Sequence, residues 1–251
     1  MNSSAWSRAD FLRGVCGGAA LAALGSGLRA QSAARPNILA IVTDDQGYAD
    51  LGAYAHAARD VRTPHMDRIA SGGVLFTRGY VTAPVCTPSR TGWNTGCYQQ
   101  RWDPAMAWTP GLPDDVRTIA ERLKSAGYAT AKVGKNDYGR NRRGHDAREY
   151  PLNHGYDEFL GFSGNHHDYF LLSEEIEKQA PDRGGRHADG LLPLTENRGY
   201  RNFENGYTTE VFTDWAIRFL EQNRRGPFLL HLSYNSIHHR SEERRGGEEC
   251  R

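Results

Sequence analysis

The chain has 251 residues, of which 31 are Lys or Arg and 30 are Asp or Glu, so its formal net charge is +1. This balance argues against a basic surface that binds nucleic acid. With 38% hydrophobic and 24% charged residues, the composition is that of a globular protein with a sizeable core. The four cysteines are too few and too widely spaced for a disulfide scaffold or a zinc cluster: Cys16, Cys86, Cys97 and Cys250.

Residues 1–30 have the layout of an export signal. A polar stretch ending at Arg13 precedes an apolar, small-residue run from Gly14 to Leu28. The run is shorter than the roughly 20 residues that a membrane-spanning helix needs, so we expect no stable membrane span. Residues 7–12 are similar to a degenerate twin-arginine signal, with Ala9 where the second arginine belongs. The segment predicts an exported protein, periplasmic or extracellular.

From residue 37 onward, apolar strands alternate with amphipathic helices. The predicted strands are residues 37–43, buried on both faces, 74–80, 128–133 and 228–234. The first predicted helix begins after Thr63 and has Met66, Ile69 and Ala70 on its inner face. Two further helices are predicted over residues 116–126 and 211–220. Residues 139–206 show weak periodicity and are predicted as long loops. This alternation predicts an α/β fold with a mostly parallel central sheet flanked by helices.

Polar side chains follow three of these strands. Asp44 and Asp45 follow the first, Lys135 follows the third and His238 follows the last. Ligands of such sheets bind at the carboxyl ends of the strands, so one site could collect all four side chains. Adjacent carboxylates on a regular strand point to opposite faces, so both bind one ion only if the chain turns just after Thr43. The alternative for the Asp pair is a simple turn or helix cap, and for Lys135 a solvated side chain.

Residues 86–90 read Cys86-Thr87-Pro88-Ser89-Arg90 and form the most specific motif. Pro88 suits the first turn of a helix, so we expect Cys86 at a helix amino terminus, where free N–H groups favour an anion. Arg90 adds a fixed positive charge. The alternative is a small buried thiol without a chemical role.

This motif resembles the signature of the formylglycine-dependent, Cys-type sulfatases. Further blocks appear in the family's order, over about residues 35–239. They are residues 35–37, 44–48, 63–67, 134–135, 154–157 and 234–238. The resemblance covers the amino-terminal part of a sulfatase, so a sulfatase/alkaline-phosphatase-like catalytic domain is expected over residues 31–239, with its carboxyl-terminal part missing. Residues 240–251 are almost all charged or glycine and are expected to be a non-native tail.

The resemblance implies a sulfuric ester hydrolase acting on a sulfated small molecule or carbohydrate. A formylglycine-generating enzyme would convert Cys86 into an aldehyde, whose hydrate supplies the nucleophile. Asp44, Asp45 and the modified Cys86 would bind Ca²⁺, or Mg²⁺, because all-oxygen ligands select these ions. The resemblance implies that Lys135 binds sulfate beside Arg90 and that His238 protonates the leaving group.

One position departs from the family pattern: Asp137 stands where a histidine is usual, two residues after Lys135. Two alternatives therefore stay open, a phosphatase or phosphonate-type hydrolase of the same superfamily and a catalytically inactive sulfatase-like protein. His154, His166 and His167 are weaker candidates for lining a substrate pocket.

Overall fold

The computed structural model describes residues 35–102, 111–138, 144–163, 167, 169–170, 194–201, 203 and 206–238. The chain divides into two compact units, Met1–Pro36 and Asn37–Arg251, and the second contains the elements described below. The predicted export signal (1–30) and the predicted tail (240–251) lie outside the described residues. In the described part, no helix combines the length and the apolar character that crossing a membrane requires.

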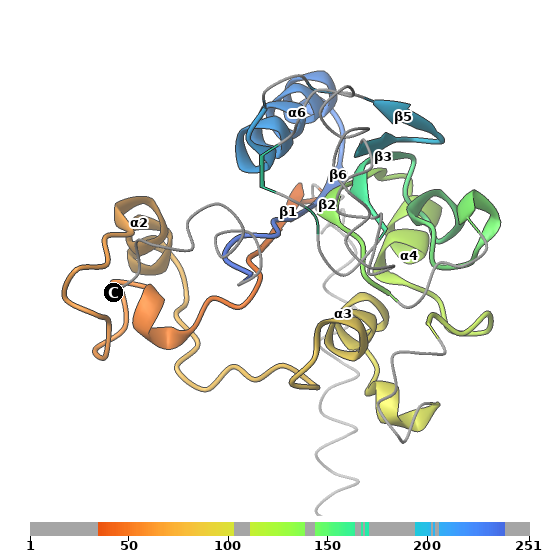
Figure 1. Ribbon diagram of the computed structural model, residues 1–251. Coiled ribbons are helices and arrows are strands. Elements are labelled where there is room, and N and C mark those ends of the chain that lie inside the picture. Colours follow the sequence, from red (N-terminus) through yellow and green to blue (C-terminus); the bar gives the residue numbers. More distant parts are fainter. Residues whose placement is uncertain are drawn as a thin grey trace, which may run out of the picture. The chain divides into compact units, whose positions relative to one another are not determined.

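The second unit is built on a mixed six-stranded sheet with the strand order β1-β6-β2-β3-β4-β5 (Figure 1). The strands are β1 (Ile38–Val42), β2 (Ala129–Lys135), β3 (Glu158–Phe162), β4 (Leu194–Glu196), β5 (Gly199–Arg201) and β6 (Phe228–Ser233). Strands β1, β6, β2 and β3 are parallel, whereas β4 and β5 pair antiparallel. The predicted α/β class and mostly parallel sheet are confirmed.

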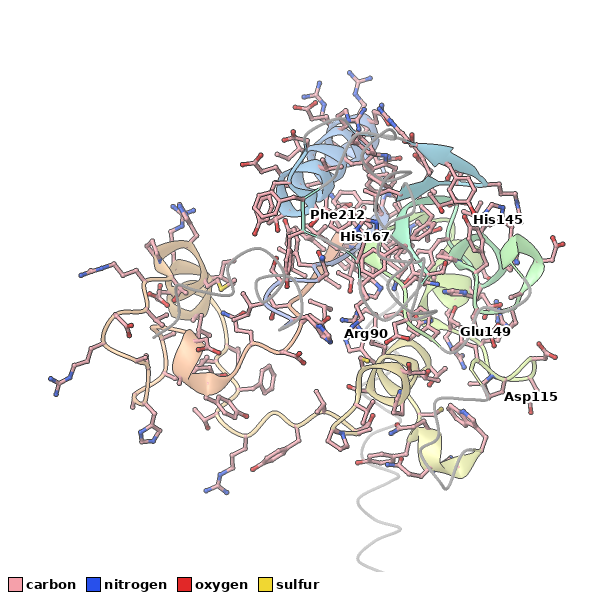
Figure 2. The ribbon with its side chains drawn as sticks, in the orientation of Figure 1. Arg90, Asp115, His145, Glu149, His167 and Phe212 are labelled. Carbon is pink, nitrogen blue, oxygen red and sulfur yellow. The ribbon has the colours of Figure 1, made fainter. Side chains whose placement is uncertain are left out.

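Helix α6 covers one face of this sheet and forms the main core. The longer helices are α2 (Pro64–Gly72), α3 (Cys86–Thr95), α4 (Ile119–Ser125) and α6 (Thr208–Asn223). Phe212 points from α6 toward the sheet (Figure 2), where it packs with Val133, Leu160 and Leu230 from three neighbouring strands. Each such side chain contributes about 1.5–3 kcal/mol by its burial. This face holds β2, β3 and β6 together and so sets where those strands end.

The opposite face of the sheet carries α4 and α3 (Figure 1). Ala120 from α4 packs with Leu229 from β6 and Tyr156, forming a second, smaller core cluster. Short 3-10 turns connect the larger elements: η1 (Tyr48–Asp50), η2 (Gln99–Arg101), η3 (Gly144–Asp146) and η4 (Pro151–Asn153).

Strand β1 differs from its prediction, because only one of its faces is shielded. Leu39 and Ile41 are 46% and 49% exposed. Leu39 pairs with Leu230, which faces α6, but α6 packs over β2, β3 and β6. In the described residues β1 is an edge strand beyond the reach of that helix. The prediction of a strand buried on both faces was therefore wrong.

Residues 74–80 do not form the predicted strand. Val74, Phe76 and Tyr80 are 78%, 73% and 83% exposed, and the segment takes no place in the described sheet. Helix α2 begins at Pro64 as predicted, but it buries none of its residues, so the predicted inner face was also wrong. High β propensity forms a strand only where a neighbouring strand and a packing surface are available.

Residues 139–206, predicted as loops, contain three of the strands. Strand β3 has five residues, and β4 and β5 have three each. Segments this short show too few alternations for a period to be read from the sequence. They are stabilised by pairing: β3 pairs with β2, β4 with β3 and β5 with β4. The prediction of loops was therefore wrong for these residues.

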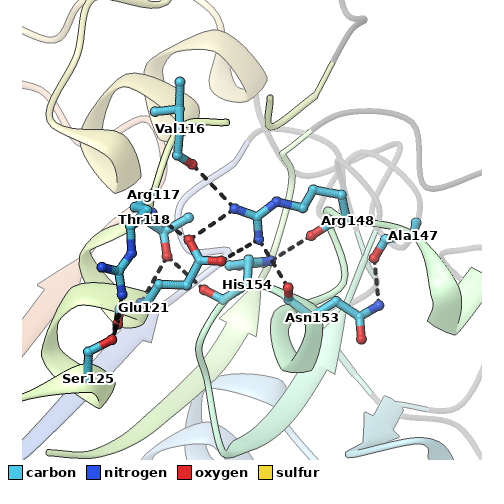
Figure 3. Close-up of polar contacts among 9 residues, drawn as sticks. All are labelled: Val116, Arg117, Thr118, Glu121, Ser125, Ala147, Arg148, Asn153 and His154. Carbon is cyan, nitrogen blue, oxygen red and sulfur yellow. Dashed lines mark hydrogen bonds and ion pairs between the residues drawn. The ribbon is translucent and has the colours of Figure 1, made fainter. Parts of the chain in front are cut away.

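A polar network fastens α4 to the loop before β3 (Figure 3). The Thr118 hydroxyl accepts from the Glu121 amide at 3.1 Å, and Glu121 Oε2 accepts from the Thr118 amide at 2.8 Å, a reciprocal cap of the helix. Arg148 pairs with both carboxylate oxygens of Glu121, at 2.8 and 3.0 Å. The Thr118 hydroxyl also donates to the His154 carbonyl at 2.7 Å. Burial alone would raise the pKa of Glu121, but the hydrogen bonds from Arg148 and the Thr118 amide lower it below 4.5.

We expect Glu121→Gln to lower the free energy of unfolding by about 1–2 kcal/mol at pH 7, because the cap loses its charged acceptor. A carboxyl whose pKa is lowered in the folded state stabilises fully above its unfolded pKa and loses this effect as the pH falls. The difference between the two proteins in urea unfolding should therefore shrink below about pH 4.5. The exposed Glu221 of α6, changed to Gln, is the control. A difference that stays constant from pH 7 to pH 3 would contradict the assignment.

Candidate active site

The carboxyl ends of three adjacent parallel strands meet at a buried carboxylate. Asp44 follows β1, and Lys135, the last residue of β2, places its Nζ 2.8 Å from Asp44 Oδ2. Arg90 extends from α3 toward the sheet (Figure 2) and places Nη2 3.1 Å from Asp44 Oδ1. Its Nη1 donates to the Ser233 hydroxyl at the end of β6. Lys135 is fully buried and Asp44 is 5% exposed, so the alternative of a solvated lysine is excluded.

The turn required after Thr43 is present. Asp45 has φ of 61°, in the left-handed region, which non-glycine residues adopt at a cost of about 1–3 kcal/mol and often at functional sites. The Asp44 amide donates to the Ser236 carbonyl at 2.8 Å, which ties the turn to the segment after β6. The Asp45 carboxylate lies 3.8 Å from Nε2 of His238 in that segment. The turn therefore places the Asp45 carboxylate beside His238 and ties the Asp44 backbone to the segment that carries this histidine.

Cys86 is the first residue of α3, as its motif predicts, with Val85 as an extended cap residue. The pKa of its thiol is raised to about 11, first by burial and then by the Asp137 carboxylate, while Lys135 acts in the opposite direction. The positive end of the helix therefore does not ionise the thiol. At neutral pH the unmodified side chain is a neutral thiol and not a thiolate nucleophile.

Asp137 occupies the position that the family pattern assigns to histidine, and its carboxylate is 4% exposed. Its Oδ1 accepts from the Thr87 hydroxyl at 2.7 Å. Its Oδ2 lies 4.0 Å from Lys135 Nζ and has no hydrogen-bond partner among the described residues. Asp137 thus stands beside the start of α3 and acts on the Cys86 thiol.

Two residues missed at this site are Ser233 and Thr87, the partners of Arg90 and Asp137. Ser233 carries the same signal that identified Lys135, a polar side chain at the carboxyl end of a strand. Thr87 is part of the Cys86 motif, but its partner lies too far along the chain for a local pattern to reveal.

The weaker histidine candidates do not line a substrate pocket where the structure describes them. His154 is fully buried between the rings of Tyr138 and Tyr156, and burial lowers its pKa to about 3. His167 is 6% exposed and packs on Phe162. His166 lies outside the described residues.

The residues able to hold a metal ion are Asp44 and Asp45. Their carboxylate oxygens are ligands that Ca²⁺ and Mg²⁺ prefer. Within the described ranges, no group of three or more His, Cys, Asp or Glu side chains could hold a metal ion. The protonated thiol of Cys86 is itself a poor ligand. The donor set fits a hard cation in type and supplies part of its coordination shell.

A cavity of about 480 Å³ lies beside the cluster. Its lining includes Val42, Arg90, Trp93, Tyr138 and His231. Cys86, Asp44 and Lys135 are not among the residues that line it, so this cavity is distinct from the space around the Cys86 side chain.

Comparison with known proteins agrees with the motif and the geometry. The family model for Sulfatase matches residues 36–249. An arylsulfatase of Hemicentrotus pulcherrimus is 33% identical over 213 residues, which are 81% of this chain and 37% of that protein. The N-acetylgalactosamine-6-sulfatase of Homo sapiens is 31% identical over 221 residues, which are 81% of this chain and 40% of that protein. The chain spans about two fifths of the length of these relatives.

The fold agrees as well. The crystal structure of Ps i-CgsB in complex with k-i-k-neocarrahexaose superimposes with a TM-score of 0.69 at 31% identity. The match covers 81% of this chain and 46% of that one. The family match, the relatives and the shared fold together show that this chain belongs to the sulfatase family.

Proposed function

We propose that the protein is an exported sulfuric ester hydrolase that cleaves sulfate esters of carbohydrates. The observation that carries the proposal is the cluster at the carboxyl ends of β1, β2 and β6, where Lys135 and Arg90 lie beside Asp44 and next to the start of α3. The human relative is named for a sulfated sugar, and the compared structure holds an oligosaccharide. Both names support a carbohydrate as the substrate class.

The protonation state of Cys86 supports the proposal that the residue is converted before it reacts. A thiol whose pKa is about 11 is almost entirely protonated at pH 7, so the unmodified sulfur is a weak nucleophile. We propose that a formylglycine-generating enzyme oxidises Cys86, and the hydrate of the resulting aldehyde then supplies an oxygen nucleophile. The neighbouring side chains Lys135 and Asp137 hold that position in a polar, mostly buried setting.

The charges of the cluster support a divalent cation. Three carboxylates, Asp44, Asp45 and Asp137, face two fixed cations, Arg90 and Lys135, which leaves one net negative charge. Such a cluster repels a sulfate group. A divalent ion bound at the Asp pair would change the net charge of the cluster from −1 to +1. Each of the two ligands, the cation and sulfate, would therefore bind more tightly in the presence of the other. We propose Ca²⁺, with Mg²⁺ as the alternative, because the available ligands are oxygens.

Different side chains are assigned to sulfate binding and to proton transfer. Lys135 and Arg90 carry the positive charge that a bound sulfate needs, and burial strengthens their interaction with it. His238 lies at the edge of the cluster, with its side chain 18% exposed and 3.8 Å from Asp45. We assign it the role of general acid, because an imidazole at that edge can deliver a proton to a departing sugar oxygen.

Two other functions remain as alternatives. A phosphatase or phosphonate-type hydrolase would use the same cations and the same Asp pair, but it would have no need of the Cys86 motif. A catalytically inactive sulfatase-like protein would be consistent with Asp137, whose carboxylate replaces a histidine. Conversion of Cys86 and turnover of a sulfate ester separate the three.

We expect wild-type protein produced with a formylglycine-generating enzyme to show the aldehyde in the tryptic peptide of residues 79–90 by mass spectrometry. We expect Cys86→Ala in the complete gene product to abolish hydrolysis of an aryl sulfate, a loss of at least about 10³-fold, because the nucleophile is gone. Cys97→Ala, which removes the other described cysteine, is the matched control and should keep its activity. Retained turnover in the Cys86→Ala enzyme would show that the nucleophile lies elsewhere.

A second prediction concerns the buried ion pairs of Asp44. We expect Lys135→Met to lower the free energy of unfolding by about 2–3 kcal/mol, because the buried Asp44 then keeps Arg90 alone as a charged partner in the described part of the chain. Adding Asp44→Asn should recover part of this loss. Denaturant unfolding of the single and double variants measures both effects.

Lys124→Met is the matched control for this prediction. Lys124 pairs with Asp157 at 2.6 Å, but the two side chains are 49% and 40% exposed, so we expect a loss below about 1 kcal/mol. Equal losses in Lys124→Met and Lys135→Met would contradict the assignment of a buried pair.

A further inference from the structure

Beneath α3, the sheet buries a group of polar side chains that the proposed reaction does not use. Lys132 points from β2 and His231 from β6, and both are at most 2% exposed, as are Tyr138 and Tyr156. Lys132 Nζ donates to the Tyr138 hydroxyl at 2.7 Å and lies 3.4 Å from His231 Nδ1. The same His231 nitrogen lies 2.9 Å from the Tyr156 hydroxyl.

Hydrogen bonds, and not charge pairs, hold this group together. Among the described residues, no carboxylate lies within ion-pair distance of Lys132. Burial lowers the pKa of Lys132 well below its ordinary value, Arg90 lowers it further and Asp137 opposes them. Burial also lowers the pKa of His231, followed by the effects of Lys132 and Arg90. The contact that Lys132 makes in this group is therefore a hydrogen bond, which its Nζ donates to the Tyr138 hydroxyl.

One side of the group contacts the helix that begins at Cys86. The ring of Trp93, in α3, lies 4.4 Å from the ring of His231. The Tyr156 hydroxyl donates to Asn94 Oδ1, also in α3, at 3.5 Å. A displacement of this group would therefore also shift α3, whose first residue is Cys86.

The other side contacts the loop that follows β2. Tyr138, which accepts from Lys132, is the neighbour of Asp137 in the chain. The Asp137 carboxylate bonds to Thr87 and raises the pKa of Cys86. A shift of the Tyr138 ring would therefore also move the backbone next to the Asp137 carboxylate.

We propose that Lys132 is a positioning residue: by holding the Tyr138 hydroxyl it keeps the Asp137 carboxylate against Thr87 and Cys86. The effect of Lys132 on catalysis rests on the proposed function. Its effect on the position of Asp137 does not, because it can be measured without turnover. If Lys132 only filled space, methionine would replace it without effect, since the two side chains have similar length. Removing the amine instead takes from the buried Tyr138 hydroxyl the hydrogen bond that Lys132 donates, so the loop should shift.

The test is the rate at which iodoacetamide labels Cys86 in the full chain, produced without the maturation enzyme. Trypsin separates Cys86, in residues 79–90, from Cys97, in residues 91–101, so mass spectrometry follows both in one sample. In Lys132→Met we expect Cys86 to be labelled about tenfold faster, because its enclosure opens locally. Cys97 should keep its wild-type rate. Lys132→Gln, which retains an N–H donor, should return the Cys86 rate to within about twofold of wild type.

The controls separate local movement from unfolding. Lys124→Met removes an exposed lysine and should leave both rates unchanged. Tyr138→Phe removes only the hydroxyl that Lys132 holds, and it should match Lys132→Met even if that variant folds poorly. A wild-type Cys86 rate in both Lys132→Met and Tyr138→Phe, or an equal defect in Lys132→Met and Lys132→Gln, would overturn the proposal.

The same variants distinguish this proposal from the proposed function. If the protein turns over a sulfate ester, Lys132→Met should lower kcat by about tenfold or more and leave KM within about twofold, because misplaced groups affect the reacting geometry. Absence of turnover in wild type would contradict the proposed function, and the labelling rates would still decide the role of Lys132.

Discussion

The buried carboxylate of Asp44, held between Lys135 and Arg90, is the interaction on which the site depends. Its two partners come from the end of β2 and from α3, so one side chain joins the sheet to the helix that begins at Cys86. Leaving any of these charges buried alone would cost several kcal/mol, so the three positions determine one another. The main core under α6 contributes by fixing where the parallel strands end.

A second layer of polar side chains lies directly beneath this cluster. Lys132 and His231 stand on the strands that also carry Lys135 and Ser233, and they face α3. One sheet therefore presents ion-paired groups at its carboxyl edge and hydrogen-bonded polar groups on the face toward α3. The ion-paired groups suit anion and cation binding, and the hydrogen-bonded groups contact α3 and the loop after β2.

The sequence predicted the parts of this arrangement that follow from strand ends. Asp44, Lys135 and His238 could be placed in one site because polar residues after parallel strands meet at one edge. The exposure of Leu39 and Ile41 could not be predicted, because it depends on how far α6 reaches across the sheet. The hydrogen-bonding role of Lys132 was also beyond prediction, since a lysine within a strand gives no sign of its neighbours on the adjacent strand.

The central claim is that the three carboxylates and two cations of the cluster, with Asp137 among the carboxylates, bind sulfate only after a divalent cation has reversed their net charge. Calorimetric titration of the chain with inorganic sulfate, in calcium and in a chelator, tests it directly. The account predicts sulfate affinity at least about tenfold higher with calcium, and no gain in the Asp44→Asn, Asp45→Asn variant. Equal sulfate affinity with and without calcium in the wild-type chain would contradict it.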